Sequence, residues 1–282
     1  MEMTPPDRSL RQRFLAEVSL ADEEINLARA AIMVAREEYP QLCEERYLGH
    51  LDLLAEEARD RLDEENAHLL VLQELLNSLY GRQGFRGNRE AYYDPRNSFL
   101  NDVLDRGLGI PLTLGIVVLE VGWRLGLPLE GVNFPGHFLV RFKGDAIDLL
   151  IDPYDGGAVR FQDEAQELLD RVYGGMVRVQ DSFLKAASKR EMLVRLLMNL
   201  KSVYLNARDH AKALSTVERI LLIRPIAVGE IRDRGVILAK LGRKDEALEQ
   251  LEAYLNVAPE AADSQRILGM VEKLKNGSGK VD

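Results

Sequence analysis

The stretch VNFPGHFLVRFKGDAIDLLIDPYDGG, residues 132–157, predicts two neighbouring strands of an antiparallel sheet. Apolar and polar side chains alternate through HFLVRF (137–142) and again through AIDLLID (146–152), as they do in strands with one buried face. Gly144 and Asp145 lie between the two runs, and a glycine in the first position suits a two-residue turn of type II′. The stretch therefore predicts a β-hairpin.

This turn sets a register that gives the hairpin one wholly apolar face. On the other face it places His137 opposite Asp152, Leu139 opposite Leu150 and Arg141 opposite Asp148. Opposed side chains of an antiparallel pair have Cβ atoms about 5 Å apart, so His137 and Asp152 can touch. The apolar face carries Phe138, Val140, Phe142, Ile147, Leu149 and Ile151.

The predicted contact between His137 and Asp152 has two explanations. A carboxylate beside an imidazole fixes its tautomer and stabilises the imidazolium, which is the base and its orienting group in a nucleophilic triad. Antiparallel sheets also carry such pairs for cross-strand stability alone, as we expect for Arg141 and Asp148. The hairpin by itself does not decide between catalysis and stability.

Length and composition limit the classes of protein to which the chain can belong. Its 282 residues are 46% hydrophobic, which is enough for two domains, and its net charge of −9 argues against nucleic acid as a partner. The sequence shows no signal-peptide core and no apolar run of the roughly 20 residues that a membrane helix needs, so we expect a cytoplasmic protein. A single cysteine, Cys43, excludes an internal disulfide and a cysteine-based zinc cluster. No phosphate-binding loop or histidine metal motif is present, so no cofactor or metal is expected.

Helical spacing dominates the chain before the hairpin. Residues 19–80 are charge-rich with apolar residues at helical intervals, and Pro40 separates two helical runs. Pro111 suits the first position of a helix over 112–125, which is apolar nearly all round and should be buried. Gly126 is a natural stop for that helix.

The C-terminal part contains an internal repeat with a period of 34 residues. Five pairs of positions match at this offset: Ala213 with Ala247, Leu214 with Leu248, Val217 with Leu251, Leu221 with Leu255, and Pro225 with Pro259. This is the period of the tetratricopeptide helix pair, whose small residue lets two helices approach closely. The sequence predicts two repeats followed by a capping helix, DSQRILGMVEKLKNG, which covers the last apolar face.

The residues between the helical opening and the repeats resemble a known family. The segments FRGNREAYYDPRNS, GIPLTLGIVVLEVGWRLG, PGH and IDPYDGG come in the order found in SirB-type bacterial proteins, which join a transglutaminase-like domain to C-terminal tetratricopeptide repeats. The resemblance implies an α+β fold with a papain-like core, in which a buried helix packs on an antiparallel sheet. We therefore expect a helical N-terminal segment (1–80), a transglutaminase-like core (81–182) and two repeats with a capping helix (188–276).

The resemblance also implies a triad from which one member is missing. In the wider superfamily the nucleophile is a cysteine at the start of the buried helix, and His137 and Asp152 would be the second and third members. Here GIPLTL has no cysteine, so Thr113 and Ser98 are the remaining weak candidates for a nucleophile. Cys43 lies outside the order of the superfamily, and we expect a half-buried helical thiol there.

These observations favour an intracellular binding or regulatory protein that has lost its thiol nucleophile. Its repeats would dock a protein or peptide partner, since tetratricopeptide surfaces commonly take peptides or helices. The alternatives are a hydrolase or acyl-transferase that uses His137 and Asp152 with a non-cysteine nucleophile, and a purely structural assembly factor. The sequence makes no prediction about the oligomeric state.

Overall fold

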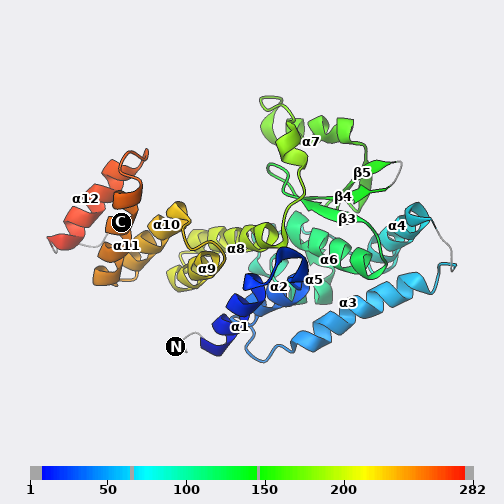
Figure 1. Ribbon diagram of the computed structural model, residues 1–282, viewed down its shortest axis with the longest axis horizontal. Coiled ribbons are helices and arrows are strands. Elements are labelled where there is room, and N and C mark those ends of the chain that lie inside the picture. The colour runs from blue at the N-terminus through cyan, green and yellow to red at the C-terminus, as the bar shows by residue number, and fades with distance from the viewer. Residues whose placement is uncertain (1–7, 64–66, 145–146, 277–282) are drawn as a thin grey trace. The chain divides into compact units, whose positions relative to one another are not determined.

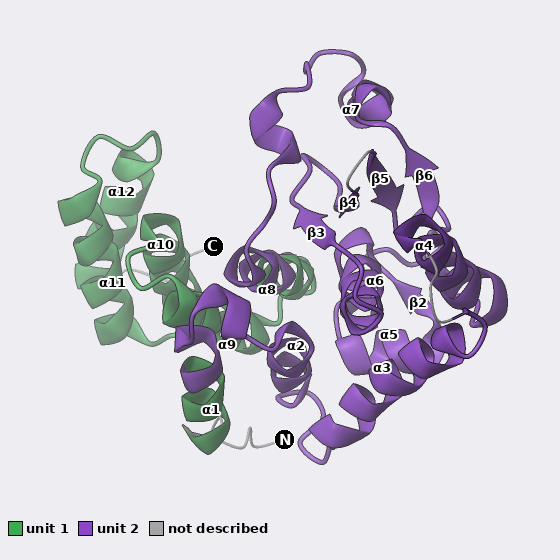
Figure 2. Cartoon of the chain, turned by 45° about the vertical axis from the view of Figure 1, so that its right-hand side comes forward, with its two compact units in different colours: residues 1–15, 197–282 green, residues 16–196 purple. Residues whose placement is uncertain are grey.

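The computed structural model describes residues 8–63, 67–144 and 147–276 of the chain (Figure 1). Contacts divide the chain into two compact units, shown in different colours in Figure 2. The core unit comprises residues 16–196, and the repeat unit comprises residues 1–15 together with 197–282. The observed fold is a mixed helical and sheet structure with one four-stranded antiparallel sheet and a helical C-terminal region, as predicted.

The core unit is built from helices, a small parallel pair of strands and one antiparallel sheet (Figure 1). Its helices are α2 (Leu27–Ala35), α3 (Glu44–Arg59), α4 (His68–Leu76), α5 (Leu100–Arg106), α6 (Pro111–Arg124) and α7 (Ala165–Tyr173), and a π-helical turn, Asn77–Arg82, extends α4. Its strands are β1 (Arg86–Gly87), β2 (Leu108–Gly109), β3 (Leu129–Val132), β4 (Leu139–Lys143), β5 (Asp148–Asp152) and β6 (Ala158–Arg160). The antiparallel sheet has the order β3-β4-β5-β6, and β1 pairs with β2.

Helix α6 is the central element of the core unit. Pro111 occupies its first turn, and every residue from Pro111 to Gly122 is buried, which confirms the predicted helix start and burial. The chain leaves the helix through Gly126, whose φ of 76° is readily adopted only by glycine. Buried Glu120 accepts a hydrogen bond from the amide of Ala28 at the start of α2, so the charge within this apolar helix stabilises another helix N-terminus.

The hairpin forms as predicted, but its register is displaced by two residues. Val140 pairs with Ile151, whereas the sequence-based register placed it opposite Leu149, and Arg141 lies opposite Leu150. The predicted pair of Arg141 and Asp148 is therefore wrong, and Arg141 binds Glu130 on β3 instead. The predicted turn at 144–145 falls partly outside the described residues. A shift of two residues changes the pairing without exchanging the faces, because side chains alternate with a period of two.

Both faces of the sheet are covered by helices. The apolar face predicted from the sequence packs on α6, and the ring of Phe138 lies against Gly115 so closely that a Cβ there would be 2.5 Å from it. The opposite face contributes Leu139 and Leu150 to a cluster with Leu168 and Leu169 of α7. Helices thus hold the sheet from both sides, and they also fix the turn that leads into β4.

The repeat unit consists of consecutive antiparallel helices. Ala213 and Ala247 are fully buried, as the repeat pattern predicted, and Gly235 lets the side chain of Leu251 pack against the helix backbone. The helices are α8 (Lys189–Asn206), whose residues up to Leu196 belong to the core unit, α9 (His210–Ile223), α10 (Val228–Lys240), α11 (Lys244–Val257) and α12 (Ser264–Lys275). The first residues of the chain join this unit through α1 (Arg8–Ser19), where Arg11 binds Glu218 of α9.

Replacing Ala247 with leucine should destabilise the repeat unit by about 1–3 kcal/mol, because the added carbon atoms enter a site with no exposed surface. Chemical denaturation followed by circular dichroism measures this change in the free energy of unfolding. The control is Ala258→Leu, which changes a partly exposed residue just beyond the end of α11. Equal stability of the two variants would show that Ala247 is not at a close helix crossing.

Candidate functional site

A tight turn before β4 carries His137. The backbone amide of His137 donates to the carbonyl of Phe134 at 3.0 Å, which closes a four-residue turn with Pro135 and Gly136 in its centre. The φ of 70° at Gly136 fits the third position of a type II turn, where glycine is preferred. A Cβ at Gly136 would also meet the side chain of Val172 at 2.8 Å, so α7 approaches this turn closely.

The turn brings His137 to Asp152 even though they are not opposite each other in the ladder. Nε2 of His137 lies 2.8 Å from Oδ1 of Asp152. Regular pairing would place Leu139 opposite Asp152, but β4 begins only at Leu139, and the preceding turn lets the imidazole reach back to the end of β5. The predicted contact is present, although the register that predicted it was wrong.

The surroundings of Asp152 favour its ionised form. Burial by itself raises the pKa of this carboxyl, but the hydrogen bond and the charge of His137 together with the amides of Tyr154 and Asp155 outweigh it and hold the pKa below its usual value. A carboxylate can only accept hydrogen bonds, so Nε2 of His137 carries the proton between them. In the neutral ring Nδ1 is then an acceptor, and it makes no hydrogen bond with any described residue. The pair can therefore take up a proton from a ligand.

Removing the imidazole should raise the pKa of Asp152. We expect His137→Gln to shift the carboxyl titration to higher pH, because glutamine can donate a hydrogen bond but carries no positive charge. NMR of the side-chain carboxyl carbon measures the pKa. Since the folded pKa is depressed, this pair stabilises the protein above roughly pH 4 and the contribution is lost as the pH falls further.

The control for this titration is Asp94, whose pKa is held low by a hydrogen bond from Arg96. Asp94 should titrate identically in the unchanged protein and in His137→Gln. If Asp152 also titrates identically, the imidazole does not stabilise its charge.

A buried amide network ties the start of α6 to the loop before it. Asn97, which has no exposed surface, accepts from Nδ2 of Asn88 at 3.0 Å and donates to the carbonyls of Ala91 and Tyr92 at 2.7 and 3.1 Å. Its own carbonyl accepts from the hydroxyl of Thr113 at 2.6 Å. The loop and the helix start are thereby fixed beside the sheet.

The two weak nucleophile candidates lie in this network or next to it. Thr113 is fully buried, and its hydroxyl donates to Asn97 and accepts from the amide of Ile110, as a threonine at a helix start commonly does. Ser98 is also buried and ends the short 3₁₀ turn before α5. Within the described residues, the side chain of His137 hydrogen-bonds to Asp152 and to neither hydroxyl. Pro111 stands at the helix start, where a thiol would be needed.

Cys43 differs from its predicted environment. It is exposed and precedes the first residue of α3, where its thiol lies 3.7 Å from a carboxylate oxygen of Glu45. The predicted half-buried helical thiol is therefore wrong, because the residue stands at the helix boundary rather than on its apolar face.

The aromatic ring of Tyr154 lies beside the imidazole, and that of Tyr92 lies next to Tyr154. The ring of Tyr154 lies 6.3 Å from that of His137 and 6.1 Å from that of Tyr92, in edge-on arrangements. The hydroxyl of Tyr154 donates to the carbonyl of Asn88. Its ring lies over Gly87 and occupies the space that a Cβ at that position would fill. Tyr154 follows Asp152 by two residues, and this proximity was the available signal in the sequence.

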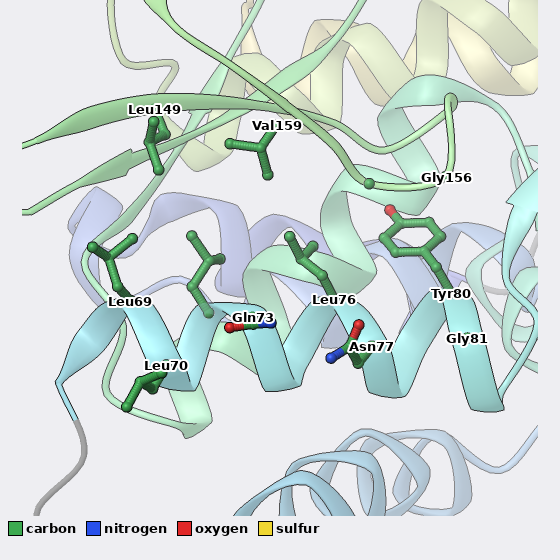
Figure 3. Close-up of a pocket in the computed structure, with 12 residues that line it drawn as sticks. Leu69, Leu70, Gln73, Leu76, Asn77, Tyr80, Gly81, Leu149, Gly156 and Val159 are labelled. Atoms are coloured by element: carbon green, nitrogen blue, oxygen red, sulfur yellow. The ribbon is translucent and has the colours of Figure 1, made fainter.

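A separate groove lies between the α4 region and the antiparallel sheet (Figure 3). It has a volume of about 460 Å³ and runs between the α4 region, with Leu69 and Leu76, and the strands with Leu149 and Val159. The hydroxyl of Tyr80 is buried and has no hydrogen-bond partner among the described residues. Burial and the charge of Asp152 raise the pKa of Tyr80. The amide of Gly157, which lines the groove, donates to the carbonyl of Asp152 at 3.0 Å, so the groove and the His137–Asp152 pair are neighbours. The sequence offered no signal for the groove.

Two further properties of the described residues bear on the site. They contain no group of three or more histidine, cysteine, aspartate or glutamate side chains placed to hold a metal ion. In the same ranges, every helix is too short or too polar to cross a membrane.

Comparison with known proteins agrees with this architecture. The model of the transglutaminase-like superfamily matches residues 45–198, and a tetratricopeptide repeat model matches residues 200–272. A UPF0162 protein of Xylella fastidiosa is 37% identical over 90% of this chain and 92% of its own length. A UPF0162 protein of Pseudomonas aeruginosa is 32% identical over 88% and 90%, and the UPF0162 protein YchA of Escherichia coli K12 is 30% identical over 91% and 96%.

Proposed function

Because the chain belongs to the transglutaminase-like superfamily and to the UPF0162 proteins, we propose that it is an intracellular binding or regulatory protein of the SirB type. Its core keeps the histidine and aspartate of the triad, and its repeats dock a protein partner. The observation that carries the proposal is the start of α6. Pro111 occupies the first turn, and the hydroxyl of Thr113 is committed to the carbonyl of Asn97.

The chemistry of the pair supports this proposal. His137 and Asp152 can bind and transfer a proton, but an acyl transfer of the superfamily type also needs an attacking thiolate. Cys43 is an exposed residue directly before α3, in a part of the chain that precedes the site. The remaining function of the pair is to bind a group that donates to Nδ1 of His137.

The protein should show no thiol-dependent acyl transfer. We expect no incorporation of a fluorescent primary amine into a glutamine-containing peptide above background, with or without alkylation of Cys43. An activity that survives Cys43→Ala and vanishes with His137→Ala would favour the alternative hydrolase or acyl-transferase. An activity abolished by Cys43→Ala would contradict the proposal, because the exposed thiol would then be the nucleophile.

Partner docking by the repeats can be tested separately. Ion pairs join alternate helices of the repeat unit, with Lys201 of α8 bound to Glu230 and Asp233 of α10. A photo-crosslinking amino acid at exposed Met198 on α8 should capture a defined partner in cells. The same amino acid at exposed Glu249 on α11 is the control, because it lies on a different helix of the repeat unit. Equal capture at both positions, or none at Met198, would argue against docking there.

A further inference from the structure

A partly buried arginine beside the His137 turn has no acidic partner. Arg195 of α8 donates from Nη1 to Oδ1 of Asn133 and to the carbonyl of Phe134, each at 3.3 Å. Its guanidinium carbon lies 5.9 Å from the centre of the Phe138 ring. None of the described carboxylates forms an ion pair with it. Its remaining donors, Nε and Nη2, make no hydrogen bond with the described residues and are not sealed from solvent.

Arg195 contacts the same turn that carries the imidazole. The carbonyl of Phe134 accepts from both Arg195 and the backbone amide of His137. The hydroxyl of Tyr173 lies 3.5 Å from the position that a Cβ on Gly136 would take. Tyr92 and Tyr173 are the titratable groups that act on the charge of Arg195. Arg195 and Tyr173 therefore both lie against the turn that carries the imidazole.

Such an arginine is costly unless something outside the chain binds it. Other half-buried cations of the protein are paired: Arg124 binds Glu120, and Arg141 binds Glu130. A buried charge without a partner loses hydration and gains no ion pair in return. Burial accordingly lowers the pKa of Arg195. Two neutral acceptors at 3.3 Å replace only part of the lost hydration.

We propose that Arg195 anchors a binding site for the carboxylate group of a ligand that has an apolar or aromatic body and lies against His137. The two donors left on Nε and Nη2 are parallel, and this edge of a guanidinium binds a carboxylate in a bidentate manner. One arginine balances the single charge of a carboxylate, whereas a doubly charged phosphate would remain uncompensated. The aromatic rings of Tyr92 and Tyr154, neither of which is buried, supply the contact surface for the body.

This inference goes beyond the proposed function, which assigns the protein partner to the repeats and gives the core only an unspecified group that donates to Nδ1 of His137. It also holds whether or not the core is catalytic, since a site can bind a carboxylate in either case. Loss of carboxylate binding would leave partner capture at Met198 unaffected, and loss of that capture would leave carboxylate binding unaffected. The two proposals therefore fail separately.

The test compares two probes that differ only in charge. N-acetylphenylalanine carries a carboxylate, and N-acetylphenylalaninamide replaces it with a neutral amide. We expect the carboxylate to shift the Nε–H resonance of Arg195 in NMR spectra of the full chain, and the amide to bind at least tenfold more weakly. Inorganic phosphate should also bind more weakly than the carboxylate. Equal binding of the amide, or tighter binding of phosphate, would overturn the proposal.

Variants show whether the effect belongs to this arginine. Arg195→Gln should weaken binding of N-acetylphenylalanine at least tenfold, and Arg195→Lys should weaken it less because the charge remains. The control is Arg89→Gln, which removes an exposed arginine that also lies over the ring of Tyr154 but is paired with Asp155. The affinity of Arg89→Gln for N-acetylphenylalanine should be within twofold of that of the unchanged protein. Equal affinities of Arg195→Gln and Arg89→Gln would contradict the site.

Thermal stability distinguishes binding from a structural role. We expect Arg195→Met to retain or raise the melting temperature, because it removes a buried charge without leaving a carboxylate unpaired. Lys201→Met should lower it, because Glu230 and Asp233 lose their common partner. If Arg195→Met lowers the melting temperature as much as Lys201→Met does, Arg195 stabilises the fold and does not serve a ligand.

Discussion

Replacing Asn97 with alanine should lower the free energy of unfolding by about 3–5 kcal/mol, the largest effect that we expect of a single change in the core unit. Each buried polar group left without its hydrogen bond costs about 1–3 kcal/mol. The change removes the partner of Asn88 and leaves the carbonyls of Ala91 and Tyr92 unpaired. Guanidinium denaturation measures the loss.

Two further variants test the cause of this effect. Asn97→Asp has nearly the same shape but would place a carboxylate beside two carbonyl oxygens, so it should destabilise the protein as strongly as alanine. Asn77→Ala is the control, because Asn77 is exposed and its replacement should change stability by less than about 0.5 kcal/mol. If Asn97→Ala and Asn77→Ala unfold at the same denaturant concentration, the buried network does not stabilise the loop.

The second large effect is expected at the contact between α6 and the sheet. A Cβ at Gly115 would lie 2.5 Å from two ring atoms of Phe138, so even alanine forces the helix and the sheet apart. Overpacking of this kind costs about 1–3 kcal/mol and exceeds the roughly 1 kcal/mol that alanine gains over glycine within a helix. Because Phe138 follows His137, the displacement should also weaken the bond to Asp152 and raise the pKa of that carboxyl.

Gly49→Ala is the matched control for Gly115→Ala. Gly49 lies within α3 and would meet nothing within 4 Å, so alanine should stabilise the protein there by about 0.5–1 kcal/mol. The two changes thus have opposite expected signs. Combining Gly115→Ala with Phe138→Leu should cost less than the sum of the single changes, since the smaller side chain leaves room for the methyl group. Strict additivity would show that the ring is not the obstacle.

Much of the candidate site could be predicted from the sequence, but one step of that prediction was wrong. The alternation through residues 137–152 correctly assigned Phe138 and Val140 to a buried face, and it predicted the contact between His137 and Asp152. The register behind that contact was displaced by two residues. Alternation has a period of two, so registers that differ by two place the same side chains on the same faces. The contact survives because a turn, and not a ladder pair, brings the imidazole to the carboxylate.

The sequence by itself determined the features that depend on neighbours in the chain. These are the start of α6 at Pro111, its burial, and the repeat with small residues at Ala213 and Ala247. Only the tertiary structure decided which side chains from distant parts of the chain join the His137–Asp152 pair. Arg195 lies far along the chain from His137, yet it shares the carbonyl of Phe134 with that residue. Periodicity records which side of a helix or strand is buried, whereas a contact between distant segments depends on how those elements pack and leaves no local pattern in the sequence.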